Sequence, residues 1–370
     1  MIEPSVNKES PDGKDIFQRY CEDPKLRLRV DAVYTYQENL LDIPFDVVLG
    51  NADFKAWHAE TCRKQQEMCD RIPLSKPISF DYVKEYENQY GRMKEYRLNW
   101  GSDNPLHGSV FGGTLAMPKE YDPNKPLIIF VHGHGMVRNY SGELRSDLFA
   151  GEDLANEVIK RGYVLWAPDN VFHDELMPLY KEHDFSDMWA IVINQTWELL
   201  KAKKALPATR HRYAIGLAAG GTTALSMTLA NKEIDGLVAS GVFFPLDLTR
   251  RDYRIKGHPM CHDFRRYASY LPLYAMALDR PLQVQMGRDD CLWAGHIALP
   301  SEWFTGLKRP VLTEESLGPI YILERLSKQF GNEFSFKLSS AGHERMDFEA
   351  AFGFINAVEE KRRMARAMHR

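Results

Sequence analysis

Short runs of apolar residues alternate with helical patterns along most of the chain after residue 90. These runs are continuous rather than alternating, which is typical of strands buried on both faces of a sheet. The predicted strands are PLIIFVHG (126–133), YVLWAPD (163–169), RYAIGL (212–217), DGLVASGVFF (235–244), RPLQVQMG (280–287) and FSFKLSS (334–340). The predicted helices lie between them, at 147–161, 186–206, 220–231 and 318–331, and after His343. This alternation predicts an α/β fold, with a mainly parallel sheet and helices on both faces.

The first 85 residues follow a different pattern. Apolar and aromatic side chains recur there at helical spacings, as at Phe54 and Trp57, without a strong alternating segment. Further on, the period shortens toward two in MKEYRLNW and SVFGGTLAMP, which predicts a leading antiparallel hairpin. We therefore expect a helical appendage over residues 1–85, acting as a lid, a homodimer contact or plain structural cover. A larger domain over residues 86–370 would carry an insertion at 246–274.

Composition and charge narrow the class of protein. The 370 residues suffice for one large domain with an appendage, and the hydrophobic and charged fractions of 44% and 26% exclude a mainly disordered or fibrous chain. The formal net charge is −4, whereas a dedicated nucleic-acid binder usually has a large excess of basic side chains, so nucleic acid is not expected as a partner. The chain has neither a signal-like start nor an apolar run of about 18 residues, so we expect a cytoplasmic protein without a membrane partner. Five scattered cysteines fit reduced thiols.

Three short segments with potentially reactive positions each follow a predicted strand. Gly216–Gly221 is a glycine-rich turn between a strand and a helix, and in the G-x-S-x-G motif such a turn exposes a nucleophilic serine. Ala218 occupies the nucleophile position here. Asp290 follows the strand at 280–287, and His343 follows the last strand. Taken singly, the segments also fit close backbone packing, a helix N-cap and a structural histidine.

The order of these segments favours catalysis. A nucleophile turn, an acid and a histidine follow successive strands in the chain order of the alpha/beta-hydrolase triad. Val131–Gly135 follows an earlier strand, where this architecture has the loop whose N–H groups form the oxyanion hole. The chain from about residue 90 to 360 resembles the alpha/beta-hydrolase superfamily. Its HGHG, GYVLWAPDN, GLAAGG, HPMCHDF, RPLQVQMGRDD and SAGHE segments resemble the dienelactone-hydrolase-like and acetyl-xylan-esterase-like branch.

The resemblance implies a role for each matched position. It makes Ala218 the nucleophile position, His343 the base, Asp290 the orienting carboxylate, and residues 86–370 the catalytic domain. The implied oxyanion donors are the N–H of Ala219 and one N–H of the His134–Gly135 turn. Enzymes of this type hydrolyse carboxylic esters through an acyl-enzyme without a metal or organic cofactor. We therefore expect a small-molecule ester as the partner and no cofactor.

Alanine at position 218 cannot attack a carbonyl carbon because it has no hydroxyl. In one interpretation, the residue is an engineered serine-to-alanine substitution that leaves a substrate trap, which the intact acid, histidine and glycines favour. In the other, the alanine is natural. The protein would then be a ligand-binding pseudo-hydrolase, or a cofactor-independent lyase or carbon–carbon hydrolase that uses a His343–Asp290 dyad.

Two segments outside the strands are candidates for substrate binding. The insertion carries Arg250 and Arg254 among tyrosines, which suits an anionic substrate, although its arginines also fit a solvated loop with neighbouring aspartates. His173 belongs to a segment rich in His, Met, Phe and Tyr that we expect at the substrate entrance. No metal site is predicted, since three soft ligands without a fourth make a weak zinc motif. These three are His258, Cys261 and His262.

Overall fold

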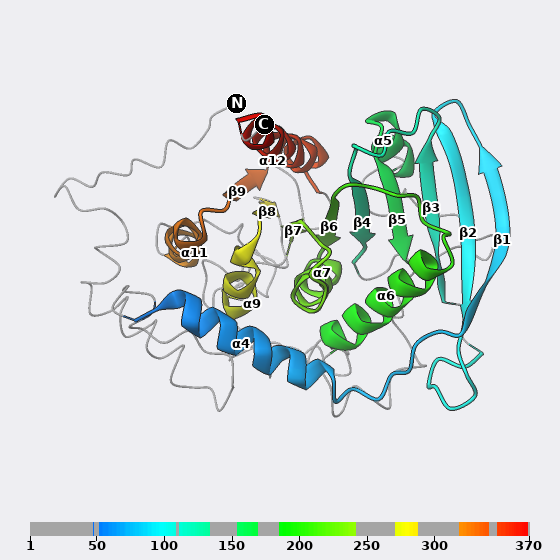
Figure 1. Cartoon of the computed structure of the whole chain (residues 1–370), viewed down its shortest axis with the longest axis horizontal. Helices are drawn as coiled ribbons and strands as arrows, with labels where there is room; N and C mark the ends of the chain where they lie inside the picture. The colour runs from blue at the N-terminus through cyan, green and yellow to red at the C-terminus, as the bar shows by residue number, and fades with distance from the viewer. Residues whose placement is uncertain are drawn as a thin grey trace, which may run out of the picture.

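One mixed β-sheet runs through the protein and is covered by helices on both faces (Figure 1). The computed structural model of the chain describes residues 47, 52–108, 111–133, 154–168, 185–241, 271–287, 318–339 and 346–368. Within these ranges the sheet has nine strands, in the order β1-β2-β3-β5-β4-β6-β7-β8-β9.

The sheet has an antiparallel part and a parallel part. The antiparallel strands are β1 (Ser79–Glu87), β2 (Gly91–Asn99) and β3 (Gly112–Pro118), and β3 also pairs antiparallel with β5 (Val164–Pro168). All further neighbours are parallel. They are β4 (Leu127–Val131), β6 (Arg212–Leu217), β7 (Gly236–Ser240), β8 (Leu282–Gly287) and β9 (Phe334–Ser339). The carboxyl ends of these parallel strands therefore share one edge of the sheet.

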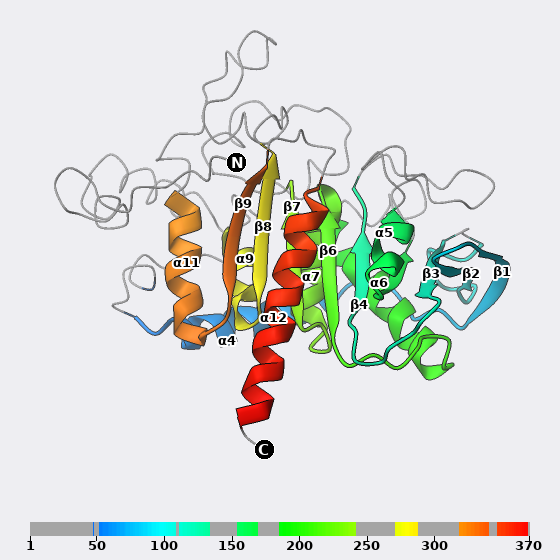
Figure 2. The same cartoon turned by 90° about the horizontal axis from the view of Figure 1, so that it is seen from above.

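The helices divide between the two faces. On one face lie α5 (Leu154–Lys160) and α12 (Phe348–Met368) (Figure 1). On the other lie α4 (Phe54–Cys69), α6 (Phe185–Ala202), α7 (Ala219–Ala230), α9 (Leu271–Met276) with the short 3₁₀ helix Ala277–Asp279, and α11 (Gly318–Phe330). Figure 2 shows α12 lying over the middle of the parallel sheet. No helix of the described ranges is long and apolar enough to cross a membrane.

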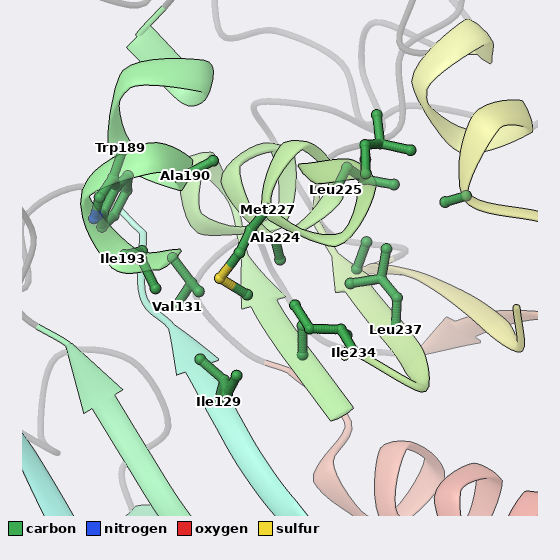
Figure 3. Close-up of a cluster of buried hydrophobic side chains, with 14 of the residues drawn as sticks. Ile129, Val131, Trp189, Ala190, Ile193, Ala224, Leu225, Met227, Ile234 and Leu237 are labelled. Atoms are coloured by element: carbon green, nitrogen blue, oxygen red, sulfur yellow. The ribbon is translucent and has the colours of Figure 1, made fainter. Parts of the chain in front are cut away.

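Continuous apolar runs in the strands supply a core on each face of the sheet. Every residue of β4 is buried, because alternate side chains of a strand point to opposite faces. Ile129 and Val131 pack with Met227 of α7 in the larger cluster (Figure 3), while Ile128 and Phe130 belong to the smaller cluster beneath α5 and α12. Each fully buried side chain of this size contributes roughly 1.5–3 kcal/mol to folding.

The predicted mainly parallel sheet with helices on both faces is confirmed. Two elements fall outside the predicted pattern. Strand β1 begins at Ser79, inside the stretch expected to be a helical appendage, and α9 begins at Leu271, inside the expected insertion at 246–274. The helix described in the appendage, α4, packs against α11 through Phe54 and Phe330, whose ring centroids are 5.4 Å apart. The division at residue 85 stays a prediction.

Candidate active site

Ala218 occupies a strained turn between β6 and α7. Its backbone angles are φ 53° and ψ −125°, and among the described non-glycine residues only Lys204 shares a positive φ. A non-glycine residue in such a region costs about 1–3 kcal/mol, so the surrounding structure must impose it. The N–H of Ala218 donates to the carbonyl oxygen of Ser240 at 2.8 Å, and the carbonyl oxygen of Ala218 accepts from the N–H of Gly221 at 2.8 Å. These bonds tie the turn to the end of β7 and to the first turn of α7.

The glycines on either side of Ala218 are required by close backbone contacts. A Cβ atom on Gly216 would lie 2.2 Å from the carbonyl oxygen of Gly220. A Cβ atom on Gly220 would lie 2.1 Å from the carbonyl oxygen of Val131 and 2.5 Å from that of His132. The G-x-A-x-G spacing therefore has a steric cause, and the sharp turn predicted from the sequence is confirmed.

Ala219 is the first residue of α7. An N–H group at this position has no partner within its own helix, and the helix dipole concentrates positive potential there. The implied role of Ala219 as an oxyanion donor is compatible with this placement and stays a prediction.

The end of β4 lies against the same turn. His132 directly follows β4 and is buried, with its Nδ1 atom 3.0 Å from the carbonyl oxygen of Gly133. Its ring meets Trp189 of α6 edge to face, with 5.9 Å between centroids. The proposed oxyanion turn, His134–Gly135, starts two residues after His132 and lies outside the described residues.

The strands that lead to the predicted acid and base are in place, whereas the two side chains lie outside the described residues. Strand β8 ends at Gly287, three positions before Asp290, and β9 ends at Ser339, four positions before His343. Because β6, β8 and β9 run parallel, the turn at Ala218 and the segments that lead to Asp290 and His343 all start at the same edge of the sheet. Open parallel sheets bind their ligands along this edge.

The predicted substrate-binding residues Arg250, Arg254 and His173 also lie outside the described residues, as does the weak metal motif within the insertion. The described ranges contain no group of three or more His, Cys, Asp or Glu side chains that could hold a metal ion. Two cysteines are described, Cys62 and Cys69, and both are thiols rather than disulfide-bonded. Burial raises the pKa of the Cys62 thiol to about 11, so it stays protonated and unreactive at neutral pH.

Sequence reasoning missed a polar contact that lies close in sequence to the predicted base. The buried side chain of Gln285, in β8, hydrogen-bonds to the main chain of Asp347, four positions after His343. The available signal was the pair of glutamines in RPLQVQMG, since an apolar residue is the usual occupant of a strand buried on both faces.

Comparison with known proteins identifies the fold. No family model and no curated protein sequence matches the chain. A Bacteroides fragilis protein named as an acetyl xylan esterase is 14% identical, and the match covers 89% of this chain and 83% of that one with a TM-score of 0.51. A glucuronoyl esterase from Solibacter usitatus is 10% identical, over 83% of this chain and 94% of that one, with a TM-score of 0.52. The protein therefore has the alpha/beta-hydrolase fold.

Proposed function

We propose that this chain is the framework of a carboxylic ester hydrolase whose nucleophile site is position 218. The strained backbone of Ala218 carries the proposal. An alanine gains nothing from a conformation that costs about 1–3 kcal/mol, whereas a nucleophile needs a sharp turn that exposes its side-chain oxygen. The similarity in fold to two proteins named as esterases supports the same reaction class.

With serine at position 218, the proposed reaction follows the acyl-enzyme route. The hydroxyl attacks the carbonyl carbon of the ester while His343 removes its proton, and the N–H of Ala219 with one from His134–Gly135 stabilises the oxyanion. His343 then protonates the leaving alcohol. In the second half, water attacks the acyl-enzyme with His343 as the base, the bond from the acyl carbon to the serine oxygen breaks as His343 returns the proton to that oxygen, and the carboxylic acid leaves. Asp290 fixes the imidazole tautomer throughout.

A second candidate function rests on the alanine itself. A methyl group at position 218 can neither attack the substrate nor hydrogen-bond it, so the chain as written would bind an ester without turning it over. This outcome is expected both of an engineered trap and of a natural pseudo-hydrolase. The proposed ligand is a small-molecule ester, and an anionic one if Arg250 and Arg254 contribute to binding.

The test is to compare Ala218→Ser with Ala219→Ser. The two variants add the same oxygen one position apart, so only the first places it at the apex of the turn. We expect Ala218→Ser to hydrolyse short aryl esters and to be labelled by a serine-directed phosphonate, and Ala219→Ser to remain inactive. Ala218→Ser with His343→Ala should lose the activity again.

Three results separate the alternatives. An inert Ala218→Ser variant that still binds ester ligands would favour the pseudo-hydrolase. Turnover by the unmodified chain that depends on His343 would favour a dyad lyase or carbon–carbon hydrolase. Equal ester hydrolysis by Ala218→Ser and Ala219→Ser would remove the support for a specific nucleophile site.

A further inference from the structure

Strand β8 carries two glutamines on the face of the sheet that α12 covers. Gln283 and Gln285 alternate with Leu282, Val284 and Met286, whose side chains belong to the core on the opposite face. Both glutamines are buried, and Gln285 is only 1% exposed. Burying an amide costs about 1–3 kcal/mol unless its polar atoms find partners, so these side chains need a compensating role.

Gln285 uses both ends of its amide on one residue. Its Nε2 atom donates to the carbonyl oxygen of Asp347 at 3.0 Å, and its Oε1 atom accepts from the N–H of Asp347 at 3.1 Å. The second hydrogen of Nε2 goes to Oε1 of Gln283 at 2.8 Å. A pair of bonds to one residue fixes orientation as well as distance, so the main chain of Asp347 is clamped to β8.

Asp347 is also the residue that starts α12. Its carboxylate accepts from the N–H of Ala350 at 2.9 Å, as an N-cap side chain does, and its carbonyl oxygen accepts the first helical bond from the N–H of Ala351 at 3.0 Å. The clamp therefore fixes where α12 begins, relative to β8.

The segment that carries His343 is fixed to β8 at its other end as well. Ser339, the last residue of β9, pairs with Gly287, and its hydroxyl donates to the carbonyl oxygen of Met286 at 3.4 Å. His343 is four positions after Ser339 and four positions before Asp347. Both anchors thus lie on three consecutive residues of β8, the strand that leads to Asp290.

We propose that Gln285 is a positioning residue, which holds the segment carrying His343 in register with the strand that leads to Asp290. This inference rests on the proposed function, because it assigns Gln285 to the pairing of that base with that acid. Gln285 does not touch substrate in this proposal. It acts by holding Asp347, which follows the segment that starts after Ser339, against β8, and in this way it sets the distance between the side chains of His343 and Asp290.

The choice of glutamine over an apolar residue supports the proposal. A methionine at position 285 would fill a similar volume and avoid burying an amide, so packing alone does not require glutamine. What methionine cannot supply is the pair of directional bonds to Asp347. Catalytic groups must be held within a fraction of an ångström of the productive geometry, and a misplacement of about 1 Å costs up to about 100-fold in rate.

The chain offers a matched control for the test. Gln285→Met and Gln283→Met each remove one buried amide from the same face of the same strand, but only the first breaks the bonds to Asp347. In the Ala218→Ser background, we expect Gln285→Met to lower kcat by ~10- to ~100-fold with KM changed less than about twofold. Gln283→Met should have a kcat within about twofold of the Ala218→Ser parent, once the activities of both methionine variants are corrected for the folded fraction.

A third variant keeps the test decisive if Gln285→Met does not fold. A carboxylic acid buried at position 285 stays neutral, so Gln285→Glu can still donate to the carbonyl oxygen of Asp347 and accept from its N–H. We expect it to retain a kcat within a few-fold of the parent. Equal losses of kcat in Gln283→Met and Gln285→Met would overturn the proposal. So would a loss of kcat in Gln285→Glu of about 10-fold or more, the loss expected when the bonds to Asp347 are broken. Neither result would count against the esterase function.

A separate measurement tests the role of Gln285 if the proposed esterase function is wrong. If Ala218→Ser is inert, the effect of Gln285 on His343 is measured in the unmodified chain by NMR of the histidine rings. The signal of His343 is assigned by its loss in His343→Gln. The ring signal of His343 should move in Gln285→Met and stay in place in Gln283→Met. An unchanged His343 signal in both variants would overturn the positioning role as well.

Discussion

The carbonyl oxygen of Val131 lies 2.1 Å from the point that a Cβ atom on Gly220 would occupy. The first turn of α7 therefore packs main chain against main chain on the end of β4, and an added methyl group must displace one of them. We expect Gly220→Ala to lower the free energy of unfolding by about 1–3 kcal/mol, measured by urea denaturation. In the Ala218→Ser background, the same change should reduce ester hydrolysis per folded molecule, because it shifts the turn that carries the nucleophile.

Gly353 supplies the control for that substitution. It is exposed within α12, and a Cβ atom there would meet nothing within 4 Å. Gly353→Ala should raise the free energy of unfolding by up to about 1 kcal/mol, since alanine favours a helix interior over glycine. Similar destabilisation by both substitutions would contradict a steric role specific to Gly220.

The strain at Ala218 predicts an unusual response to glycine. Replacing alanine with glycine commonly destabilises a protein, yet at φ 53° and ψ −125° glycine pays no Cβ penalty. We expect Ala218→Gly to leave the free energy of unfolding unchanged or to raise it by about 1 kcal/mol. Ala224→Gly, a buried position in the interior of α7, should instead lower it by about 1 kcal/mol or more. Comparable losses at the two positions would show that the turn is not strained.

The mainly parallel sheet could be predicted because its signals are local and strong. A strand buried on both faces, such as β4, is mainly apolar, so its sequence has a short, continuous apolar run that ends in turn residues. The turn at Ala218 was predictable for a related reason, because the backbone contacts of Gly216 and Gly220 leave no room for a side chain.

Features set by distant parts of the chain were harder to predict. Strand β1 is an edge strand that is largely exposed on both faces and broken by a register shift between Tyr82 and Lys84, so its sequence has no continuous apolar face. The contact between Gln285 and Asp347 joins residues 62 positions apart. A buried glutamine indicates that a partner exists, but only the fold brings that partner within reach.

The burial of His58 leads us to expect a loss of stability in mild acid. Its Nε2–H donates to the carbonyl oxygen of Met276 at 2.6 Å, and its ring lies against Phe54 and Phe330. Burial lowers the pKa of His58 below the ordinary value of 6.5, outweighing the opposite effects of the Met276 carbonyl and Asp279. The positive charges of Lys232 and Arg280 lower it further.

The sign of the effect follows from proton uptake on unfolding. Because the unfolded chain binds a proton at His58 more readily than the folded chain, stability is fully present above pH 6.5 and is lost as the pH falls toward the lowered pKa. Urea denaturation between pH 7.5 and pH 5.5 should show a falling free energy of unfolding. His58→Gln keeps a donor for Met276 but cannot titrate, so its curve should be flatter over this range. Parallel curves for the two proteins would contradict the prediction.

Glu359 of α12 should matter for stability and not for turnover. Its carboxylate accepts from the hydroxyl of Tyr213 at 2.5 Å and from Nδ1–H of His211 at 2.7 Å, while Nε2 of His211 accepts from Arg366 at 2.9 Å. Burial raises the pKa of Glu359, but the hydrogen bonds from His211 and Tyr213 and the charge of Arg362 outweigh burial and lower this pKa below its ordinary value. Glu359→Gln turns one acceptor into a donor facing a donor, so we expect it to lower the free energy of unfolding by about 1–3 kcal/mol.

The neighbouring residue provides the control for Glu359. Glu360 is exposed and pairs with Arg363 at 3.2 Å, so Glu360→Gln should change the free energy of unfolding by less than about 0.5 kcal/mol. Tyr213 and His211 lie at the amino end of β6, at the opposite end of the strand from Ala218. In the Ala218→Ser background, kcat per folded molecule should therefore be equal in the two variants. A kcat reduced only in Glu359→Gln would mean that the anchoring of α12 reaches the segment of His343, and that this end of the helix contributes to the site.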